Sequence, residues 1–158
     1  MTAKAATNAT RVLDAMKVPY ATTTFAAADF TGEEAAEKLG VPLDEVYKTL
    51  VLSGDRTGPL AAVVPAGARL SLKKLARVSG NKTVELLPLP KMESLTGYVK
   101  GGCSPFGMKR KLPLFVDASA PGKPRIFCSA GQRGVQLVLA GDALVSASGA
   151  TPADIVED

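Results

Sequence analysis

Three segments of the chain carry apolar residues at the spacing of an amphipathic helix. They cover residues 8–17, 31–39 and 72–78. Thr31 and Ser71 stand at the start of two of them, where a hydroxyl accepts a hydrogen bond from a free amide of the first helical turn. The pattern therefore predicts three helices, with shorter helical turns at residues 41–46, 91–95 and 142–145. The inward face of the third helix is expected to consist of Leu72, Leu75 and Ala76.

Runs of β-branched, aromatic and aliphatic residues between turn signals predict the strands. The run at 60–64 is nearly all apolar, so it is expected to lie in the centre of a sheet. It follows a strand at 47–53 through a turn at 54–59, and together these form a hairpin. The remaining strands are expected at residues 20–25, 83–86, 114–117, 125–129 and 135–139.

The order of these helices and strands limits the possible fold classes. Helices and strands do not alternate strictly, which predicts an α+β protein built on one curled, mixed sheet with helices on its outside. At 158 residues the chain is expected to form a single domain over residues 1–158. No apolar run approaches the roughly 18 residues of a membrane helix. The first residues lack the apolar core of an export signal, so the expected location is the cytoplasm.

The sequence contains no histidine. This excludes Ser-His-Asp and Cys-His catalysis, histidine acid–base chemistry and histidine metal ligands. Two cysteines without histidine also make a zinc site improbable, so no metal and no cofactor are expected. Cys103 and Cys128 are interpreted as structural free thiols, although their pairing stays open on sequence grounds. An enzyme with this composition must use lysine, carboxylates, hydroxyls, backbone amides or groups of its substrate.

The modest net charge of +4 conceals a strongly basic middle third. Residues 69–111 hold ten basic and two acidic residues, a net charge of +8. Such a block attracts polyanions and positions them through phosphate contacts. The alternative is ordinary solubilising charge scattered over the surface. The candidates for contact with the phosphates of such a polyanion are Lys73, Lys74, Arg77, Lys109, Arg110 and Lys111.

A glycine-rich stretch at residues 97–111 is the most distinctive part of the chain. Glycine permits positive φ and a close approach of ligand to backbone, so Gly101 and Gly102 are candidates for presenting amide groups to an oxygen. Ser104 adds a hydroxyl, and Pro105 fixes the direction of the chain after it. The alternative is a surface hairpin with a solvated run of charge.

Lys48 places a cation inside the apolar strand at 47–53. Strand alternation puts it on the face opposite Tyr47 and Thr49. It either extends to solvent or lines a polar cavity, where it would pair with a phosphate or a carboxylate. Tyr20 and Asp117 are weaker candidates, because each has a simple role in packing or in a turn.

Three motifs, at residues 47–51, 97–109 and 129–134, resemble in sequence and order the YbaK/EbsC family, stand-alone relatives of the prolyl-tRNA synthetase editing domain. The resemblance covers nearly the whole chain and is strongest to the branch that deacylates Cys-tRNA(Pro). It implies a barrel-like sheet and hydrolysis of a wrong amino acid from the 3′ end of tRNA. Gln132 departs from the arginine expected there in many relatives.

The resemblance also implies roles for particular residues. Lys48 would hold the phosphate of the terminal adenosine, and Gly101 and Gly102 would polarise the ester carbonyl. The substrate thiol would attack its own ester, which suits a chain without histidine. The residues that would shape the pocket are Tyr20, Thr49, Ser104, Pro105 and Asp117. The resemblance further implies that the polyanion contacted by the basic middle third is tRNA.

Two alternatives stay open. One is a deacylase of the same fold that acts on another mischarged tRNA, carrying alanine or serine. The other is a non-catalytic module that binds tRNA or nucleotide as a partner of a synthetase. The expected partners are therefore a mischarged tRNA and prolyl-tRNA synthetase, with no membrane partner. The sequence gives no oligomeric state.

Overall fold

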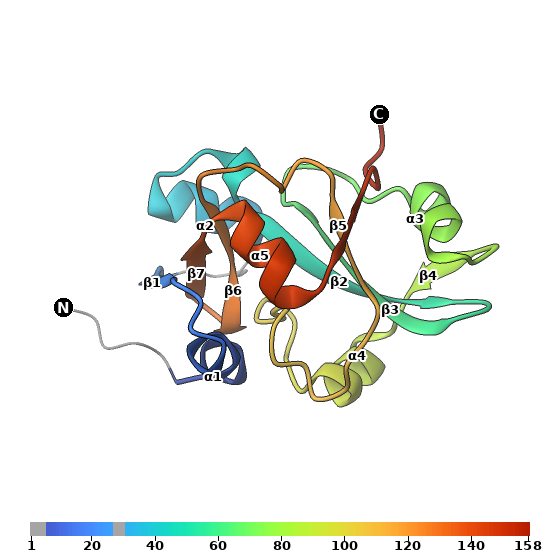
Figure 1. The fold of residues 1–158 in the computed structure, drawn as a ribbon, viewed down its shortest axis with the longest axis horizontal. Helices are drawn as coiled ribbons and strands as arrows, with labels where there is room; N and C mark the ends of the chain where they lie inside the picture. Colours follow the sequence, from blue (N-terminus) through green and yellow to red (C-terminus); the bar gives the residue numbers. More distant parts are fainter. Residues whose placement is uncertain (1–5, 27–30) are drawn as a thin grey trace.

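The computed structural model describes residues 6–26 and 31–158, and shows an α+β fold with two sheets (Figure 1). The helices among these residues are α1 (Asn8–Ala15), α2 (Gly32–Leu39), α3 (Leu72–Ser79), α4 (Leu89–Thr96) and α5 (Gly141–Ser148). A 3-10 turn, η1, covers Leu43–Glu45. The strands are β1 (Ala21–Thr24), β2 (Tyr47–Gly54), β3 (Gly58–Pro65), β4 (Val84–Leu86), β5 (Leu114–Asp117), β6 (Ile126–Gln132), β7 (Val135–Leu139) and β8 (Thr151–Ala153).

The larger sheet is mixed and has the order β4-β2-β3-β5-β8. β2 and β3 form the predicted antiparallel hairpin, and β3 pairs in parallel with β5 on its other side. The central position expected for β3 is confirmed, and five successive residues of it, 60–64, are fully buried. Strands covered on both faces carry continuous apolar runs, which explains the sequence of β3.

The smaller sheet is antiparallel, with the order β1-β7-β6. The expectation of one curled, barrel-like sheet is therefore wrong, because the strands divide between two sheets. Within the described residues, one isolated parallel bridge, between Val46 and Phe127, links the two. The cause lies in the edge of β2, where β4 pairs only from Leu52 onward and the one bridge to β6 is formed by Val46, the residue before β2.

Helix boundaries follow the predicted capping signals. The side chains of Thr31 and Ser71 accept hydrogen bonds from the backbone amides of Glu34 and Lys74, each at 3.1 Å. α2 ends at Gly40 in the left-handed conformation, with φ of 67°. Leu72 was expected to face inward, but it is 44% exposed, because it is the first residue of α3 and lies at the edge of the apolar face.

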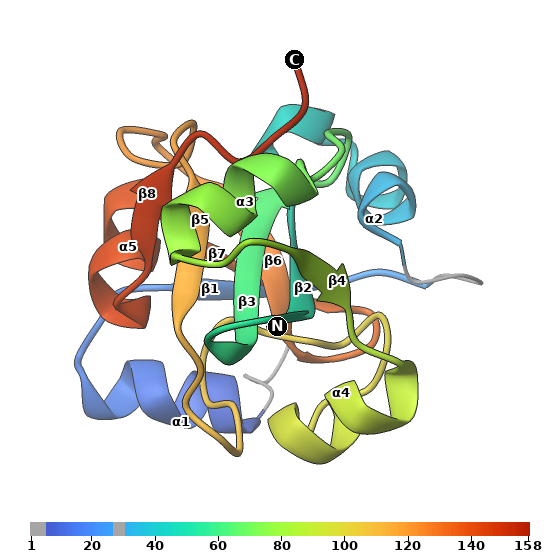
Figure 2. The ribbon, with the colours of Figure 1, turned by 90° about the vertical axis from the view of Figure 1, so that its right-hand side faces the viewer.

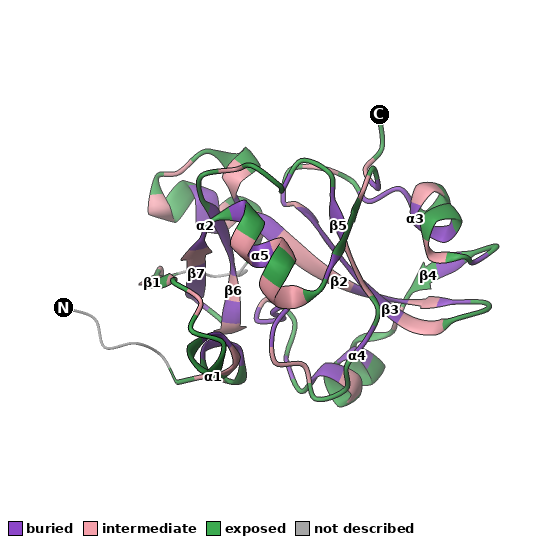
Figure 3. Cartoon of the chain, in the orientation of Figure 1, coloured by how far each residue is buried: buried purple, intermediate pink, exposed green. Residues whose placement is uncertain are grey.

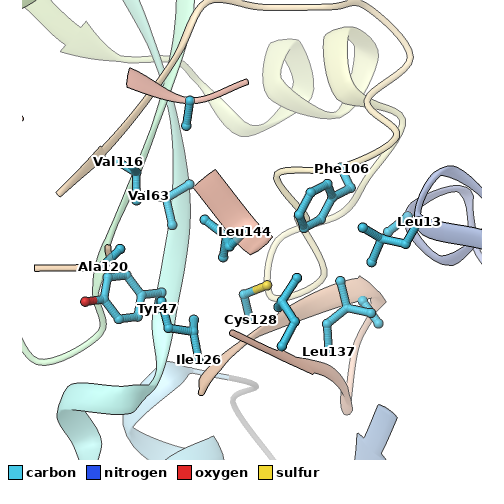
Figure 4. Packing of buried hydrophobic residues seen from close by; sticks show 14 of the residues in the cluster. Leu13, Tyr47, Val63, Phe106, Val116, Ala120, Ile126, Cys128, Leu137 and Leu144 are labelled. Carbon is cyan, nitrogen blue, oxygen red and sulfur yellow. The ribbon is translucent and has the colours of Figure 1, made fainter. Parts of the chain in front are cut away.

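One core cluster joins the two sheets. Figure 4 shows Tyr47 and Val63 of the larger sheet close to Leu144 of α5, with Leu137 of the smaller sheet and Phe106 of the glycine-rich stretch nearby. All five side chains are almost completely buried. Burial follows the middles of the strands and the inner faces of the helices (Figure 3). Packing of this kind fixes the position of the glycine-rich stretch relative to β2.

Candidate functional site

A cavity of about 430 Å³ opens along one edge of β2. Its walls come from the start of α2, from the segment between β4 and α4, from the smaller sheet and from Lys100, Gly101 and Cys103. Figure 2 shows α2 and α4 on the same side of the molecule, with β4 and β2 between them. Its volume lies in the range of small-molecule sites, and its lining is mainly apolar.

The register of β2 explains why a cavity forms here. Val46 accepts a hydrogen bond from the amide of Ala66 on the β3 side, whereas Val51 accepts one from Leu87 on the opposite side. Because backbone groups alternate in direction along an antiparallel strand, the amide and carbonyl of Thr49 point to the same side as those of Val51. β4 has not begun at that position, so this stretch of backbone opens on the cavity.

Lys48 lies half-buried at the junction of two hollows. It lines the cavity and also a neighbouring hollow of about 550 Å³, which Arg69 and Leu72 border. Its Nζ donates to the carbonyl oxygen of Ala66 at 3.3 Å, and no carboxylate of residues 6–26 or 31–158 pairs with it. The ammonium therefore has donors to spare for an anion between the two hollows.

Gly101 lines the cavity in the left-handed conformation, with φ of 83°. Gly102 differs, because its amide donates to the carbonyl of Val99 at 2.9 Å. A Cβ on Gly102 would lie 3.2 Å from the backbone nitrogen of Arg133, so glycine allows a close packing of the two segments there. The structure thus brings Lys48, Thr49 and Gly101 to one cavity. Donation by the Gly102 amide to a substrate carbonyl stays a prediction. The bond from this amide to Val99 does not favour it.

Hydrogen bonds within the glycine-rich stretch, to the end of α4 and to the distant Arg133 hold this stretch in place. The guanidinium of Arg133 donates to the carbonyl of Lys100 at 2.7 Å. The Tyr98 hydroxyl donates to the carbonyl of Phe106 at 2.6 Å, and the amide of Lys109 donates to Thr96. Preorganised backbone donors need this kind of support to act on a ligand.

The remaining predicted pocket residues lie outside the cavity lining. Ser104 and Pro105 are buried, and the Ser104 hydroxyl accepts from the amide of Phe106 at 3.3 Å. Tyr20 donates to the Asp14 carboxylate at 2.8 Å, and burial with this carboxylate raises the pKa of Tyr20 to about 12. Buried Asp117 accepts from the amides of Ser119 and Ile155. These contacts match the packing and turn roles considered for them, and substrate contact stays a prediction.

Several cavity residues were not predicted from sequence: Glu33, Lys100, Ser129 and Gln136. The hydroxyl oxygen of Thr49 and the side-chain oxygen of Gln136 are buried without a hydrogen-bond partner in the described part of the chain. Buried polar atoms are normally paired with protein, water or a ligand, so both atoms are available as partners in the cavity. Gln136 was detectable as a polar residue between Val135 and Leu137 of a predicted strand.

Both cysteines are free, as predicted. Cys103 lines the cavity, and burial raises the pKa of its thiol to about 12. Cys128 is completely buried in the core, which raises its pKa to about 12 as well. Both thiols stay protonated near neutral pH, so neither is an activated nucleophile.

The predicted basic residues fall into two groups. α3 carries Lys73, Lys74 and Arg77, and it lies on the opposite side of β4 from α4 (Figure 2). Lys74 is occupied, because its ammonium pairs with Asp154 at 3.0 Å and Asp158 at 2.9 Å. The second group, residues 109–111, is exposed and adjoins the end of α4.

The described residues contain no group of three or more potential metal ligands among their cysteines and carboxylates. None of their helices is long and apolar enough to span a membrane.

The chain belongs to the aminoacyl-tRNA editing domain family, whose model matches residues 27–147. It is 44% identical to EbsC of Enterococcus faecalis, named as a candidate Cys-tRNA(Pro)/Cys-tRNA(Cys) deacylase, over 94% of this chain and 92% of EbsC. A proline–tRNA ligase of Nitratidesulfovibrio vulgaris is 34% identical over 58% of this chain and 16% of the ligase. A crystal structure described as a candidate trans-editing enzyme for prolyl-tRNA synthetase superposes with a TM-score of 0.84 at 26% identity, covering 98% of this chain and all of the other.

Proposed function

We propose that this protein is a trans-acting deacylase that removes cysteine from mischarged Cys-tRNA(Pro). The observation that carries the proposal is one cavity that gathers a cation, an open strand edge and a left-handed glycine. Family membership gives the substrate class, and the extensive identity to EbsC favours cysteine among the amino acids. A tRNA substrate implies action in the cytoplasm, and the related segment of a proline–tRNA ligase favours cooperation with that synthetase.

In this proposal Lys48 binds the phosphate that links the last two nucleotides. Its ammonium lies between two hollows, so the terminal adenosine with its amino acid enters the first, and the preceding nucleotide enters the second. The exposed cations at residues 109–111 contact phosphates further along the acceptor stem. Contacts of this kind position a nucleic acid without reading its sequence.

The ester carbonyl would lie against the amide of Gly101. Such a donor stabilises the negative charge that develops on the carbonyl oxygen in the transition state. The cysteinyl sulfur attacks the carbonyl carbon, the bond to the ribose oxygen breaks, and that oxygen takes the thiol proton. Water then opens the cyclic thioester to free cysteine. This route requires no histidine, and the chain has none.

The lining of the cavity bears on the choice of amino acid. Val51, Leu87, Met92 and Cys103 give it an apolar wall. A thiol is transferred to such surroundings more readily than a serine hydroxyl, which would lose its hydrogen bonds to water. This favours cysteine over serine, and it leaves alanine as the second candidate.

The test is a panel of tRNA(Pro) carrying cysteine, alanine, serine or proline, assayed with and without a chelator. We expect Cys-tRNA(Pro) to be hydrolysed fastest and the chelator to have no effect. Faster hydrolysis of Ala-tRNA(Pro) would show that the enzyme prefers alanine to cysteine. Binding of tRNA without release of any amino acid would show that the protein is a tRNA-binding module and not an enzyme.

A further inference from the structure

Two residues of the cavity lining, Gln136 and Thr49, each carry a buried side-chain oxygen without a hydrogen-bond partner in the described part of the chain. The Gln136 side chain is 7% exposed, and its Oε1 has no hydrogen-bond partner within residues 6–26 and 31–158. The Oγ1 of Thr49 is equally without one. A buried polar group that lacks a partner destabilises the folded protein. Two such atoms in the lining of one cavity are consistent with a ligand that donates the missing hydrogen bonds.

Strand geometry directs Gln136 into the cavity. Its neighbours Val135 and Leu137 belong to the main core cluster, so the side chain of Gln136 points to the opposite face of β7. The residue paired with it on β6 is Ser129, which lines the same cavity. Thr49 comes from the larger sheet, so both sheets contribute to this polar end.

The two atoms without a partner are oxygens that accept hydrogen bonds, although the Gln136 amide nitrogen and the hydroxyls of Thr49 and Ser129 can also donate. Gln136 offers its amide oxygen, Thr49 its hydroxyl and, through the open edge of β2, its carbonyl oxygen. Of the two cations that line the cavity, Lys48 adjoins Thr49 on β2, where strand alternation directs its side chain to the other face, and Lys100 belongs to the glycine-rich stretch. A ligand group that only donates hydrogen bonds matches such a set of acceptors best, and an ammonium group is one.

We propose that Gln136 and Thr49 bind the α-amino group of the esterified amino acid. The inference rests on the proposed deacylase function and adds to it a determinant of specificity separate from the phosphate and carbonyl contacts. A free α-amino group is then a requirement of the enzyme. Esters whose amino group is missing or acylated are poor substrates.

The test compares two tRNA(Pro) esters, cysteinyl and 3-mercaptopropionyl, which differ only in the amino group. The wild-type enzyme is expected to hydrolyse the cysteinyl ester at least tenfold faster, measured as kcat/KM. Gln136→Leu is expected to slow the cysteinyl ester by about 10- to 100-fold, the usual effect of losing a hydrogen bond to a charged group, and to leave the other ester unchanged. Gln136→Glu, which keeps the acceptor, is expected to retain activity on the cysteinyl ester.

Equal wild-type rates on the two esters would overturn the amino-group site while leaving the deacylase intact. Equal slowing of both esters by Gln136→Leu would assign the residue a structural role instead. Hydrolysis of neither ester would refute the proposed function itself. If Gln136→Leu does not fold, Thr49→Val takes its place with the same expected selectivity, and the wild-type comparison still decides.

Discussion

Replacing Gly101 by alanine tests whether the left-handed backbone at the cavity serves catalysis. Gly101 has φ of 83°, and Gly122, in the turn between β5 and β6, has φ of 84°. A Cβ on Gly122 would meet no atom within 4 Å, and this glycine does not line the cavity. Gly122→Ala is therefore a matched control with the same backbone strain at a distant site.

The strain has a predictable size. A left-handed conformation costs a residue with a Cβ about 1–2 kcal/mol. For a chain of this length each kcal/mol lowers Tm by about 2–4 °C, so we expect a decrease of about 2–8 °C in both variants. In Gly101→Ala we expect the strained peptide to relax by rotation of its amide, which moves this donor out of position. Misplacement of a catalytic group by about 1 Å lowers the rate on the order of 10²-fold.

Single-turnover deacylation of Cys-tRNA(Pro), measured well below both Tm values, separates the two effects. Gly101→Ala is expected to lose about 10²-fold in rate, whereas Gly122→Ala keeps the wild-type rate despite its lower Tm. Equal rates in the two variants would remove the Gly101 amide from the mechanism. Equal losses would show that strain alone, wherever it lies, impairs the enzyme.

Three further predictions concern other parts of the molecule. Lys48→Met is expected to lower kcat/KM by about 10- to 100-fold through a lost charge-assisted hydrogen bond, with partial recovery in Lys48→Arg; an unchanged KM for tRNA would contradict phosphate binding. Alanine at residues 109–111 is expected to reduce the slope of log kcat/KM against log salt by about 2–3. Lys74→Ala should instead lower Tm and leave that slope unchanged, because two carboxylates and a carbonyl hold its ammonium; the reverse result would exchange the roles of the two groups. Burial raises the pKa of the Cys103 and Cys128 thiols from 9.0 to about 12, so the unfolded chain loses these protons at lower pH than the folded one. Stability is therefore complete below pH 9 and falls as the pH rises toward 12, by about 1.4 kcal/mol per unit and thiol. A double alanine variant should show a shallower decline in Tm above pH 9, and parallel curves would refute the assignment.

Local signals explain which parts of the fold were predictable. Thr31, Ser71 and Gly40 mark helix ends through single hydrogen bonds and one backbone conformation, so the sequence states them directly. β8, with the sequence Thr-Pro-Ala, carries no strand signal, and it is a strand only because β5 lies beside it. The division into two sheets depends equally on distant pairing, which periodicity does not encode.

The same distinction applies to the site. Lys48 is conspicuous as a cation in an apolar strand, and Gly101 as part of a glycine pair. Gln136 lies about ninety residues further along than Lys48. It stands out only in the folded chain, where no described residue donates a hydrogen bond to its side-chain oxygen. The Gly102 amide donates to the carbonyl of Val99, and Lys74 pairs with Asp154. The sequence indicates neither contact, because each forms only when the chain folds.

The interrupted edge of β2 also affects whether copies of the protein can pair with one another through this strand. An unpaired strand edge invites intermolecular pairing, which leads to aggregation. Here β4 occupies one end of the edge and the Val46–Phe127 bridge the other, so the uncovered stretch is shorter than a typical strand of five or six residues. A foreign strand would gain too few ladder hydrogen bonds in so short a gap to pair stably. The open peptide groups of β2 thus line the cavity without offering an edge long enough for intermolecular pairing.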